Sequence, residues 1–279
     1  TGIQIVNLRH DREEERRTRY AKLLSEKRSR EGMTFEEAFE KMYERNYFGM
    51  MMVETGEADA LITGVITKYE DSVKAARTVI GARPGVNSIG AMHIMNTKKG
   101  TYFLADTLFN RHPSTETIID VAKLTYDTVK FFAHEPVMAL LSYSNFGSDK
   151  EGSPASVHKV NQVLQERYPD MVVDGEMQAN FALNKELRDR KYPFSRLKGK
   201  DVNTLIFPNL SSANMVQQMM LELGLAETIG PIQMGLNKPV HILDVESSVR
   251  SIVNMTAVAV LDAIVQEKIE KGEVERIGE

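Results

Sequence analysis

The 279-residue chain contains no cysteine and no tryptophan. The lack of cysteine excludes disulfide bonds, cysteine-ligated zinc, iron–sulfur clusters and thiol catalysis. An excess of positive charge is lacking too, since the formal net charge is −4 and the pI is about 6.0. Such a chain has no general attraction for nucleic acid or for an anionic membrane surface. Any anion that it binds must therefore be held by locally placed Arg and Lys side chains.

Long apolar runs are also absent. We find no signal peptide and no uninterrupted run approaching the roughly 18 residues of a membrane span. The remaining composition, 42% hydrophobic and 27% charged, is typical of a globular protein. We therefore predict a cytoplasmic location. The chain starts at Thr1 and runs at once into an apolar stretch, which we interpret as the interior of a longer protein.

Several enzyme fingerprints are missing. The chain has no GxGxxG, GxxxxGK[ST] or GxSxG motif, which excludes the usual nucleotide-binding loops and the common hydrolase elbow. The six histidines are scattered and form no HExxH motif, so we expect structural roles for them and no metal site. Asp174–Glu176 follows an apolar run; we predict a turn there, and a pair of acidic catalytic groups is the alternative.

The chain does contain a recurring unit of apolar strand, polar corner and helix. Strands are predicted at Ala60–Ile66, Val137–Tyr143 and Thr204–Phe207, with a fourth after Pro239. Apolar strands without polar alternation are typical of sheets buried on both faces, so the pattern predicts mostly parallel sheets in an α/β fold. Between the first two units, residues 91–106 predict a hairpin around a Lys/Gly turn.

The N-terminal region predicts a strand at Ile3–Leu8 and then two helices. The first helix is expected at Arg12–Ser29 and ends at Gly32. The second is expected to begin at Thr34, because Glu37 three residues later completes a capping box. The charged residues of the first helix are interpreted as a solvated face with pairs one turn apart.

Pro and Gly residues indicate where the chain passes between two halves of the molecule. We expect two sheets, with crossings near Arg83–Gly85 and Gly230–Pro231. The predicted domains are residues 1–85 with 233–279, and residues 86–232.

The corners after the predicted strands are where we expect a ligand. Ligands of open α/β sheets bind at the carboxyl ends of strands, where helix N-termini favour an anion. The corners TGVITKYEDS, SYSNFGSDKEGS, PNLSSAN and DVESS are rich in small polar residues, which suits a phosphate. Arg28, Lys68, Lys74 and Lys150 could complete such a site. The alternative is that these Ser and Gly residues only cap helices and form turns.

Five segments carry a resemblance to a known family. GEADALITG, LLSYSNFGS, PDMVVDGEMQAN, FPNLSSANM and IGPIQMGLNKPV resemble, in order and spacing, the phosphate acetyl/butyryltransferases. The resemblance runs from about Ile5 to the C-terminal helix and leaves the family's N-terminal strands unmatched. It implies two three-layer α/β/α (Rossmann-like) domains, a cleft between them that binds coenzyme A, and a homodimer. It also implies acetyl transfer between acetyl phosphate and the CoA thiol.

The family's functional residues are only partly present. Arg28 matches a phosphate-binding Arg, but Lys74 stands where a second Arg is expected. The family pattern P-[IV]-N-D-L-S-R-G-C-S-x-x-D-I-V aligns with Pro239–Val253, and its catalytic Ser, Arg and Asp positions hold Asp244, Val245 and Ser251. Loss of the Arg removes an anion-stabilising cation, and a Ser without an activator does not replace a carboxylate base. We therefore expect no intact catalytic residues. The expected CoA- or phosphate-binding residues are Arg28, Lys74, Ser142, Ser144, Asn145, Gly147 and Ser148.

A binding site without its catalytic groups is typical of a regulatory domain. FLADTLFNRHPSTETIIDVA and LSYSNFGS resemble the tail of the long bacterial malic enzymes. That resemblance implies an acetyl-CoA sensor that helps the oligomer to assemble and is joined to a malic-enzyme half, which alone would hold NADP and a divalent metal. One alternative is an active phosphate acetyltransferase with His241 or Asp244 as base. A second is a purely structural dimerisation domain.

Overall fold

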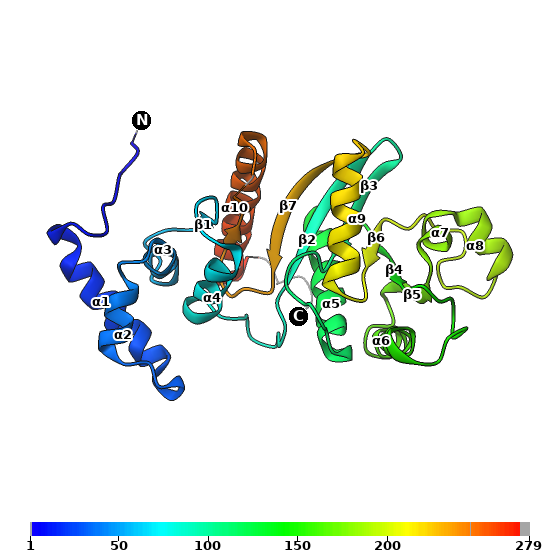
Figure 1. The fold of residues 1–279 in the computed structure, drawn as a ribbon, viewed down its shortest axis with the longest axis horizontal. Coiled ribbons are helices and arrows are strands. Elements are labelled where there is room, and N and C mark those ends of the chain that lie inside the picture. Colours follow the sequence, from blue (N-terminus) through cyan, green and yellow to red (C-terminus); the bar gives the residue numbers. More distant parts are fainter. Residues whose placement is uncertain (1, 246, 274–279) are drawn as a thin grey trace. The chain divides into compact units, whose positions relative to one another are not determined.

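The computed structural model describes residues 2–245 and 247–273, in two compact units (Figure 1). Of the described residues, unit 1 takes in those up to Pro84 and those from Leu236 to Glu273, and unit 2 is Gly85–Gly235. The passage at Pro84 lies at one of the two predicted crossings. The crossing predicted at Gly230–Pro231 is wrong, because both residues lie inside strand β7 and the chain changes unit only after Gly235.

Unit 1 is a helical unit with a short parallel sheet. Its elements are α1 (Glu14–Lys27), α2 (Phe35–Lys41), α3 (Arg45–Glu54), β1 (Leu61–Thr63), α4 (Tyr69–Val79), β8 (Val240–Ile242) and α10 (Val249–Glu270). Strands β1 and β8 pair in parallel, with Leu61 opposite Val240. Tyr20, Leu24 and Met51 belong to the buried apolar core that joins the helices to this sheet.

The predicted start of the second helix is confirmed. Thr34 accepts a hydrogen bond from the backbone N–H of Glu37, whose carboxylate accepts one from the N–H of Thr34. Gly32, at the end of the short 3-10 turn Ser29–Glu31, has a φ of 83°, a conformation that costs glycine little. Local side-chain chemistry therefore determines this helix boundary.

The strand predicted at Ile3–Leu8 is wrong. Residues 2–7 form no helix or strand, and the side chains of Ile3 and Ile5 are 82% and 81% exposed. Val6 and Leu8 pack against the core of unit 1. An apolar run becomes a strand only when a neighbouring strand accepts its backbone hydrogen bonds, and β1 and β8 pair only with each other among the described residues.

Unit 2 is built on a mixed sheet of six strands in the order β5-β4-β6-β3-β2-β7. Its elements are β2 (Gly90–Thr97), β3 (Gly100–Ala105), α5 (Thr115–Phe131), β4 (Val137–Leu141), α6 (Gly152–Arg167), β5 (Val172–Met177), α7 (Ala179–Leu183), α8 (Lys185–Lys191), β6 (Thr204–Ile206), α9 (Leu210–Glu222) and β7 (Ala226–Met234). Strands β5, β4, β6 and β3 run parallel, whereas β2 is antiparallel to both β3 and β7. The predicted hairpin is confirmed as β2–β3.

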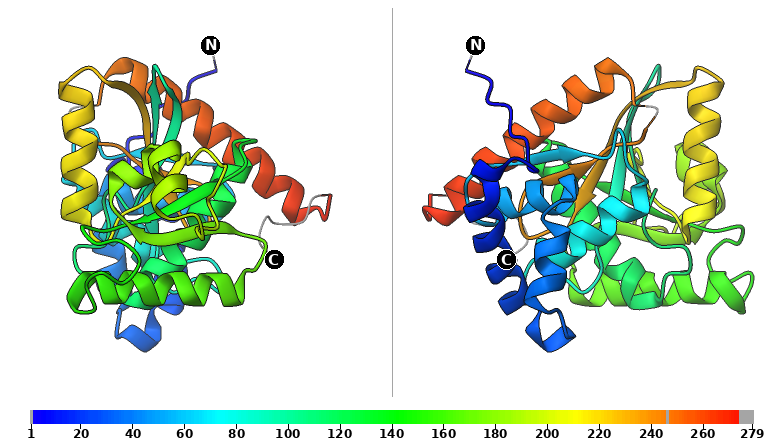
Figure 2. Two further views of the ribbon diagram at one scale, coloured as in Figure 1. Left: turned by 90° about the vertical axis from the view of Figure 1, so that its right-hand side faces the viewer. Right: turned by 60° about the vertical axis from the view of Figure 1, so that its left-hand side comes forward.

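Helices cover both faces of this sheet. Helices α5 and α6 contact each other, α6 contacts β4 and β5, and α5 contacts β2, β3 and β7. On the other face, Ala139, Leu104 and Leu205 share a buried core with Ala182 of α7 and Ala213 of α9 (Figures 1 and 2). Because α5 and α6 each connect strands of the sheet, the fold confirms the α/β architecture and places the β4–α6 and β6–α9 corners at strand ends.

The turn predicted at Asp174–Glu176 is also wrong. These residues lie inside β5, and both carboxyl side chains are buried. The turn prediction assumed that water would be the hydrogen-bond partner of these polar side chains. Here hydrogen-bond donors from neighbouring segments hold both carboxylates, so the strand continues through them.

One helix of the described chain, α10, is long and apolar enough to cross a membrane by length and composition alone. The expectation from the sequence covered only uninterrupted apolar runs. In α10, isolated polar residues interrupt the apolar run, but the helix as a whole remains apolar enough to pass this test. Only 17% of the 18-residue window that meets this test is buried within the structure. Met255, Val258 and Ala259 are buried, and the helix contacts β1 and β8, so α10 is part of unit 1 (Figure 2).

Arg188 of α8 holds together the irregular segment between α7 and β6. Its side chain is fully buried, and its guanidinium donates to the carbonyl oxygens of Ala182, Leu197 and Lys200 at 3.1, 2.8 and 2.6 Å. These bonds satisfy the carbonyl of Ala182 in the last turn of α7 and those of Leu197 and Lys200, which lie outside any helix or strand.

Replacement of Arg188 by Met should lower the free energy of unfolding by about 3 kcal/mol, because three carbonyl groups lose a charged donor. Arg190→Met, at an exposed position of the same helix, is the control and should change it by less than about 0.5 kcal/mol. Urea unfolding followed by circular dichroism measures both. Equal effects would contradict this role of Arg188.

Candidate functional site

The corner between β4 and α6 is fastened to the end of β5. The N–H of Ser142 donates to the carbonyl of Met177 at 2.9 Å. Gln178 donates from its side chain to the carbonyl of Tyr143 at 2.7 Å and from its backbone to the Asn145 side-chain oxygen at 2.9 Å. We call residues 142–149 the β4–α6 loop. Its conformation depends on a strand that is distant in sequence.

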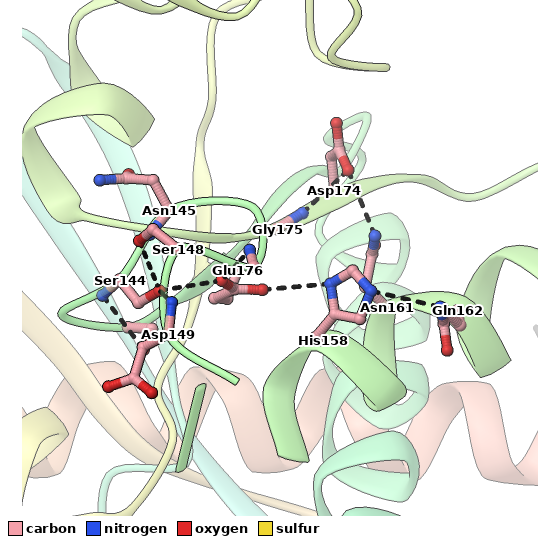
Figure 3. A network of polar contacts seen from close by, with 12 residues as sticks. Ser144, Asn145, Ser148, Asp149, His158, Asn161, Gln162, Asp174, Gly175 and Glu176 are labelled. Atoms are coloured by element: carbon pink, nitrogen blue, oxygen red, sulfur yellow. Dashed lines mark hydrogen bonds and ion pairs between the residues drawn. The ribbon is translucent and has the colours of Figure 1, made fainter. Parts of the chain in front are cut away.

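Glu176 is the centre of these contacts, as Figure 3 shows. Its carboxylate is fully buried and accepts hydrogen bonds from the Gly147 N–H at 2.6 Å and the Ser144 hydroxyl at 3.1 Å. Its backbone carbonyl accepts from the N–H of Phe146 at 2.8 Å. The second carboxylate oxygen lies 3.2 Å from Nδ1 of His158 on α6. One residue of β5 thus holds three residues of the loop.

The Ser hydroxyls predicted to bind a ligand take part in this network. The Ser144 oxygen also lies 3.0 Å from the Ser148 oxygen and accepts from the Asp149 N–H at 3.1 Å. Ser148 accepts from the Asn145 N–H at 3.1 Å. Gly147 supplies its N–H to Glu176, so this N–H is engaged as well. These groups shape the loop before any ligand arrives.

Three donors of this corner have no described protein partner. They are the Ser142 hydroxyl hydrogen, the side-chain NH2 of Asn145 and the ammonium of Lys150. In Figure 3 the Asn145 amide points away from Glu176. Because donors and a cation bind anions, these groups are the ones that the corner can offer to a phosphate.

The loop also carries a hydrogen-bonded carboxylate. The N–H of Glu151 donates to Asp149 at 3.0 Å and the hydroxyl of Tyr143 donates at 2.8 Å. The backbone hydrogen bond from Glu151 and, second, the hydroxyl hydrogen bond from Tyr143 lower the pKa of Asp149. The same bond to Asp149 raises the pKa of the Tyr143 hydroxyl. Asp149 therefore stays ionised and adds negative charge beside Lys150.

The β6–α9 corner is a helix cap. The Asn209 side chain accepts from the N–H of Ser212 at 3.0 Å, and the Ser212 hydroxyl donates to the Asn209 carbonyl at 2.9 Å. The polar residues of PNLSSAN thus follow the alternative interpretation, in which they start a helix.

In unit 1 the corners after β1 and β8 touch. The N–H of Leu243 donates to the carbonyl of Thr63 at 2.8 Å, which continues the parallel pairing beyond the strands. Gly64 has a φ of 108°, and a Cβ there would overlap the Leu243 carbonyl oxygen and lie 2.9 Å from its nitrogen. Only glycine permits this approach.

Hydroxyl groups of the β1–α4 corner form a closed network. Asn46 accepts from the Thr63 hydroxyl at 2.5 Å and donates to Ser72 at 3.0 Å, and Thr67 lies 3.0 Å from Ser72. Asn46 and Ser72 are buried. These side chains fix the corner at the start of α4.

The cations predicted for an anion site in unit 1 differ in their surroundings. Arg28 donates to the carbonyls of Thr78 and Arg77 at 2.6 and 2.8 Å, and to the carboxylate of Glu31 at 2.7 Å. Lys68 and Lys74 are exposed at the start and middle of α4. Arg28 therefore joins the ends of α1 and α4, and the two Lys side chains face solvent.

The corner after β8 holds the three substituted positions. Val245 is 62% exposed and Asp244 is exposed. Ser251 lies in the first turn of α10, where its N–H and hydroxyl both contact the hydroxyl of the N-cap Ser248. His241, the alternative base, is 1% exposed within β8, with Nε2 3.4 Å from Asp262 of α10.

The described residues contain no cluster of His, Cys, Asp and Glu that could hold a metal ion. The predicted binding residues fall into two sets, Arg28 and Lys74 in unit 1 and the β4–α6 loop residues in unit 2. Sequence reasoning placed Glu176 in a turn and did not predict its contacts with the β4–α6 loop and His158. The DGE segment was a usable signal, because two acidic residues beside an apolar strand need donors if they are buried.

The sequence profile of the phosphate acetyl/butaryl transferase family matches residues 1–260. Because the match takes in most of the 279 residues, the chain belongs to this family. Among solved structures, a phosphotransacetylase from Streptococcus pyogenes matches with a TM-score of 0.83 and 30% identity, over 92% of this chain and 77% of that chain.

Proteins similar to this chain include malic enzymes and phosphate acetyltransferases. The chain is 40% identical over 237 residues to an NADP-dependent malic enzyme of Salmonella typhimurium, which is 84% of this chain and 31% of that enzyme. It is 32% identical over 231 residues to a phosphate acetyltransferase of Bacillus subtilis, which is 83% of this chain and 71% of that enzyme. The chain thus spans about a third of the length of the malic enzymes that it matches first.

Gly64→Ala tests the close approach of the two corners in unit 1. We expect it to lower the free energy of unfolding by about 3 kcal/mol or more, because left-handed strain adds to overlap with Leu243. Gly56→Ala is the matched control: its φ is 76° but a Cβ there meets nothing within 4 Å. It should cost about 1 kcal/mol. Urea unfolding gives the free energy of unfolding of both variants. Similar decreases in the two variants would rule out the steric explanation.

Proposed function

We propose that this chain is the phosphotransacetylase-like regulatory domain of a malic enzyme, which binds acetyl-CoA without transferring its acetyl group. The observation that carries the proposal is the corner after β8. Its backbone still follows β8 and leads into α10, yet Asp244, Val245 and Ser251 stand at the family's Ser, Arg and Asp positions.

The physical argument concerns charge. Acetyl transfer from acetyl phosphate places negative charge on an oxyanion and on phosphate, which a cation and hydrogen-bond donors stabilise. An exposed Val offers neither, and the carboxylate of Asp244 repels a phosphate group. Loss of one such donor costs about 10²-fold to 10³-fold in rate, so three substitutions predict little or no turnover.

Binding has separate support. The β4–α6 loop keeps its fold through Glu176, and Asn145, Ser142 and Lys150 can donate to an anion such as a CoA phosphate. Greater identity to malic enzymes than to phosphate acetyltransferases favours a regulatory role. Feedback requires only that acetyl-CoA bind one state of the enzyme more tightly than another. NADP and a divalent metal belong, in this proposal, to a separate malic-enzyme half.

Calorimetry with acetyl-CoA and a transfer assay with acetyl phosphate and CoA test the proposal on the full chain. We expect binding and a rate at least about 10²-fold below that of the Bacillus subtilis phosphate acetyltransferase. Asn145→Ala and Lys150→Ala should each weaken binding by about fivefold to tenfold, as expected for one hydrogen bond or ion pair to a phosphate. Lys22→Ala, at an exposed position of α1, is the control and should leave affinity unchanged.

Two results would contradict the proposal. Rapid transfer that Asp244→Asn or His241→Gln abolishes would show an active phosphate acetyltransferase with a substitute base. Failure to bind acetyl-CoA at millimolar concentration would leave a structural domain.

Assembly of the oligomer is the second part of the proposed role, and α9 supports it. Met215 and Met219 of α9 and its C-cap residue Leu223 recur every four residues and are 59%, 61% and 65% exposed. Glu222 is the one charged residue of this helix. An uncharged apolar stripe of this kind is complementary to itself, so a second copy related by a twofold axis can cover it.

Met219→Glu should shift the chain toward the monomer, because a carboxylate would be buried against an apolar surface. Gln218→Glu adds the same charge at the neighbouring exposed position, outside the stripe, and should leave the assembly unchanged. Analytical ultracentrifugation across a concentration series gives the dissociation constants. A Met219→Glu variant as oligomeric as the parent would exclude this surface.

A further inference from the structure

Strand β5 carries two buried carboxylates that serve different segments. Asp174 is 6% exposed and Glu176 is fully buried. Asp174 accepts from the Ser195 hydroxyl at 2.7 Å and from the Arg196 N–H at 2.8 Å. Its other oxygen accepts from the Asn161 side chain on α6 at 3.3 Å and from the Gly175 N–H at 3.0 Å. None of these partners lies in the β4–α6 loop, whereas Ser144 and Gly147, which donate to Glu176, do.

The bonds of Glu176 are those that decide the shape of the loop. One oxygen of its carboxylate takes both the Gly147 N–H and the Ser144 hydroxyl. Phe146, between them, has a φ of 48° and donates its N–H to the Glu176 carbonyl. Phe146 and Gly147 are both in the left-handed region, which a flexible loop does not maintain without fixed partners.

The other carboxylate oxygen depends on His158. Nδ1 of this ring lies 3.2 Å from Glu176, and Nε2 lies 3.2 Å from the side-chain nitrogen of Gln162 one turn further along α6 (Figure 3). A buried carboxylate without a donor on one oxygen is costly, so the ring completes its hydrogen bonds. His158 thereby links the loop to α6.

We infer that Glu176 is the positioning residue of the β4–α6 loop, and that His158 orients its carboxylate. Glu176 is fully buried, so we assign it no direct contact with a ligand. It acts by setting where the donors of Ser142 and Asn145 point, through its bonds to Ser144 and Gly147. The inference rests on the proposed binding of acetyl-CoA for its functional consequence, but the loop geometry can be tested without a ligand.

Hydrogen exchange measured by mass spectrometry tests the geometry on the full chain. Glu176→Ala should raise exchange in peptides covering residues 143–149 by at least about tenfold, because the Phe146 and Gly147 amides lose their fixed surroundings. Glu176→Gln should restore part of the protection, since its amide oxygen can still accept from Gly147 and Ser144. Asp174→Asn, the matched buried control, should raise exchange in residues 192–200 and leave 143–149 unchanged.

Calorimetry with acetyl-CoA tests the functional consequence. Glu176→Gln should weaken binding about fivefold to tenfold and Glu176→Ala by more than about 100-fold, as the loop donors lose their placement. Asp174→Asn should bind acetyl-CoA as tightly as the parent, even if its thermal stability falls as much as that of the Glu176 variants. This split between affinity and stability is one that a merely structural role would not produce.

His158 has its own pair of variants. Asn places an amide nitrogen close to the position of Nδ1, so His158→Asn should keep the loop protected. His158→Leu removes the donor, and exchange of residues 143–149 should rise by about threefold or more. Equal behaviour of these two variants would exclude the orienting role of His158.

The outcomes separate the inference from the proposed function. If Glu176→Gln and Asp174→Asn change both segments alike, Glu176 is a general core residue and the inference is overturned. If the parent chain binds no acetyl-CoA, the proposed function fails. The exchange pattern then decides by itself whether Glu176 positions the loop.

Discussion

The fold of unit 2 around the β4–α6 loop depends on a carboxylate kept out of water. Glu176 is fully buried, and a buried charge is tolerated only when donors surround it. Ser144, Gly147 and His158 are those partners, and they come from two segments that the sequence separates from β5. The electrostatic need of one side chain therefore fixes a loop, a strand end and a helix with respect to one another.

Unit 1 shows a corner whose shape and chemistry have diverged. The contact of Gly64 with Leu243 keeps the ends of β1 and β8 together, and the N-cap Ser248 starts α10 in the usual way. The side chains presented there include Val245 and Asp244, which are exposed and carry no positive charge. The chain thus belongs to the family without the Ser and Arg that the family pattern has at this corner, and the proposed role as a sensor of a CoA ester rests on that difference.

The features that sequence predicted well are local ones. The capping box of Thr34, the β2–β3 hairpin and the strand–corner–helix units all follow from residues within one turn or one strand. Features that depend on distant partners were missed. Ile3–Leu8 has the composition of a strand but no neighbour, and Glu176 was placed in a turn because its donors lie about 30 residues upstream in the chain. Arg28 was recognised, but not its acceptors at Arg77 and Thr78.

The position of Arg28 has a consequence for how an anion could use it. Its guanidinium already serves two carbonyl oxygens at the end of α4 and the carboxylate of Glu31. These contacts use three of its five N–H groups, so a phosphate could take the other two without disturbing α4. A phosphate that also displaced the bonds to Arg77 and Thr78 would release the last turn of α4, whose carbonyls would then need water. Only in this second case do occupancy by an anion and order at the end of the helix become opposing demands on one side chain.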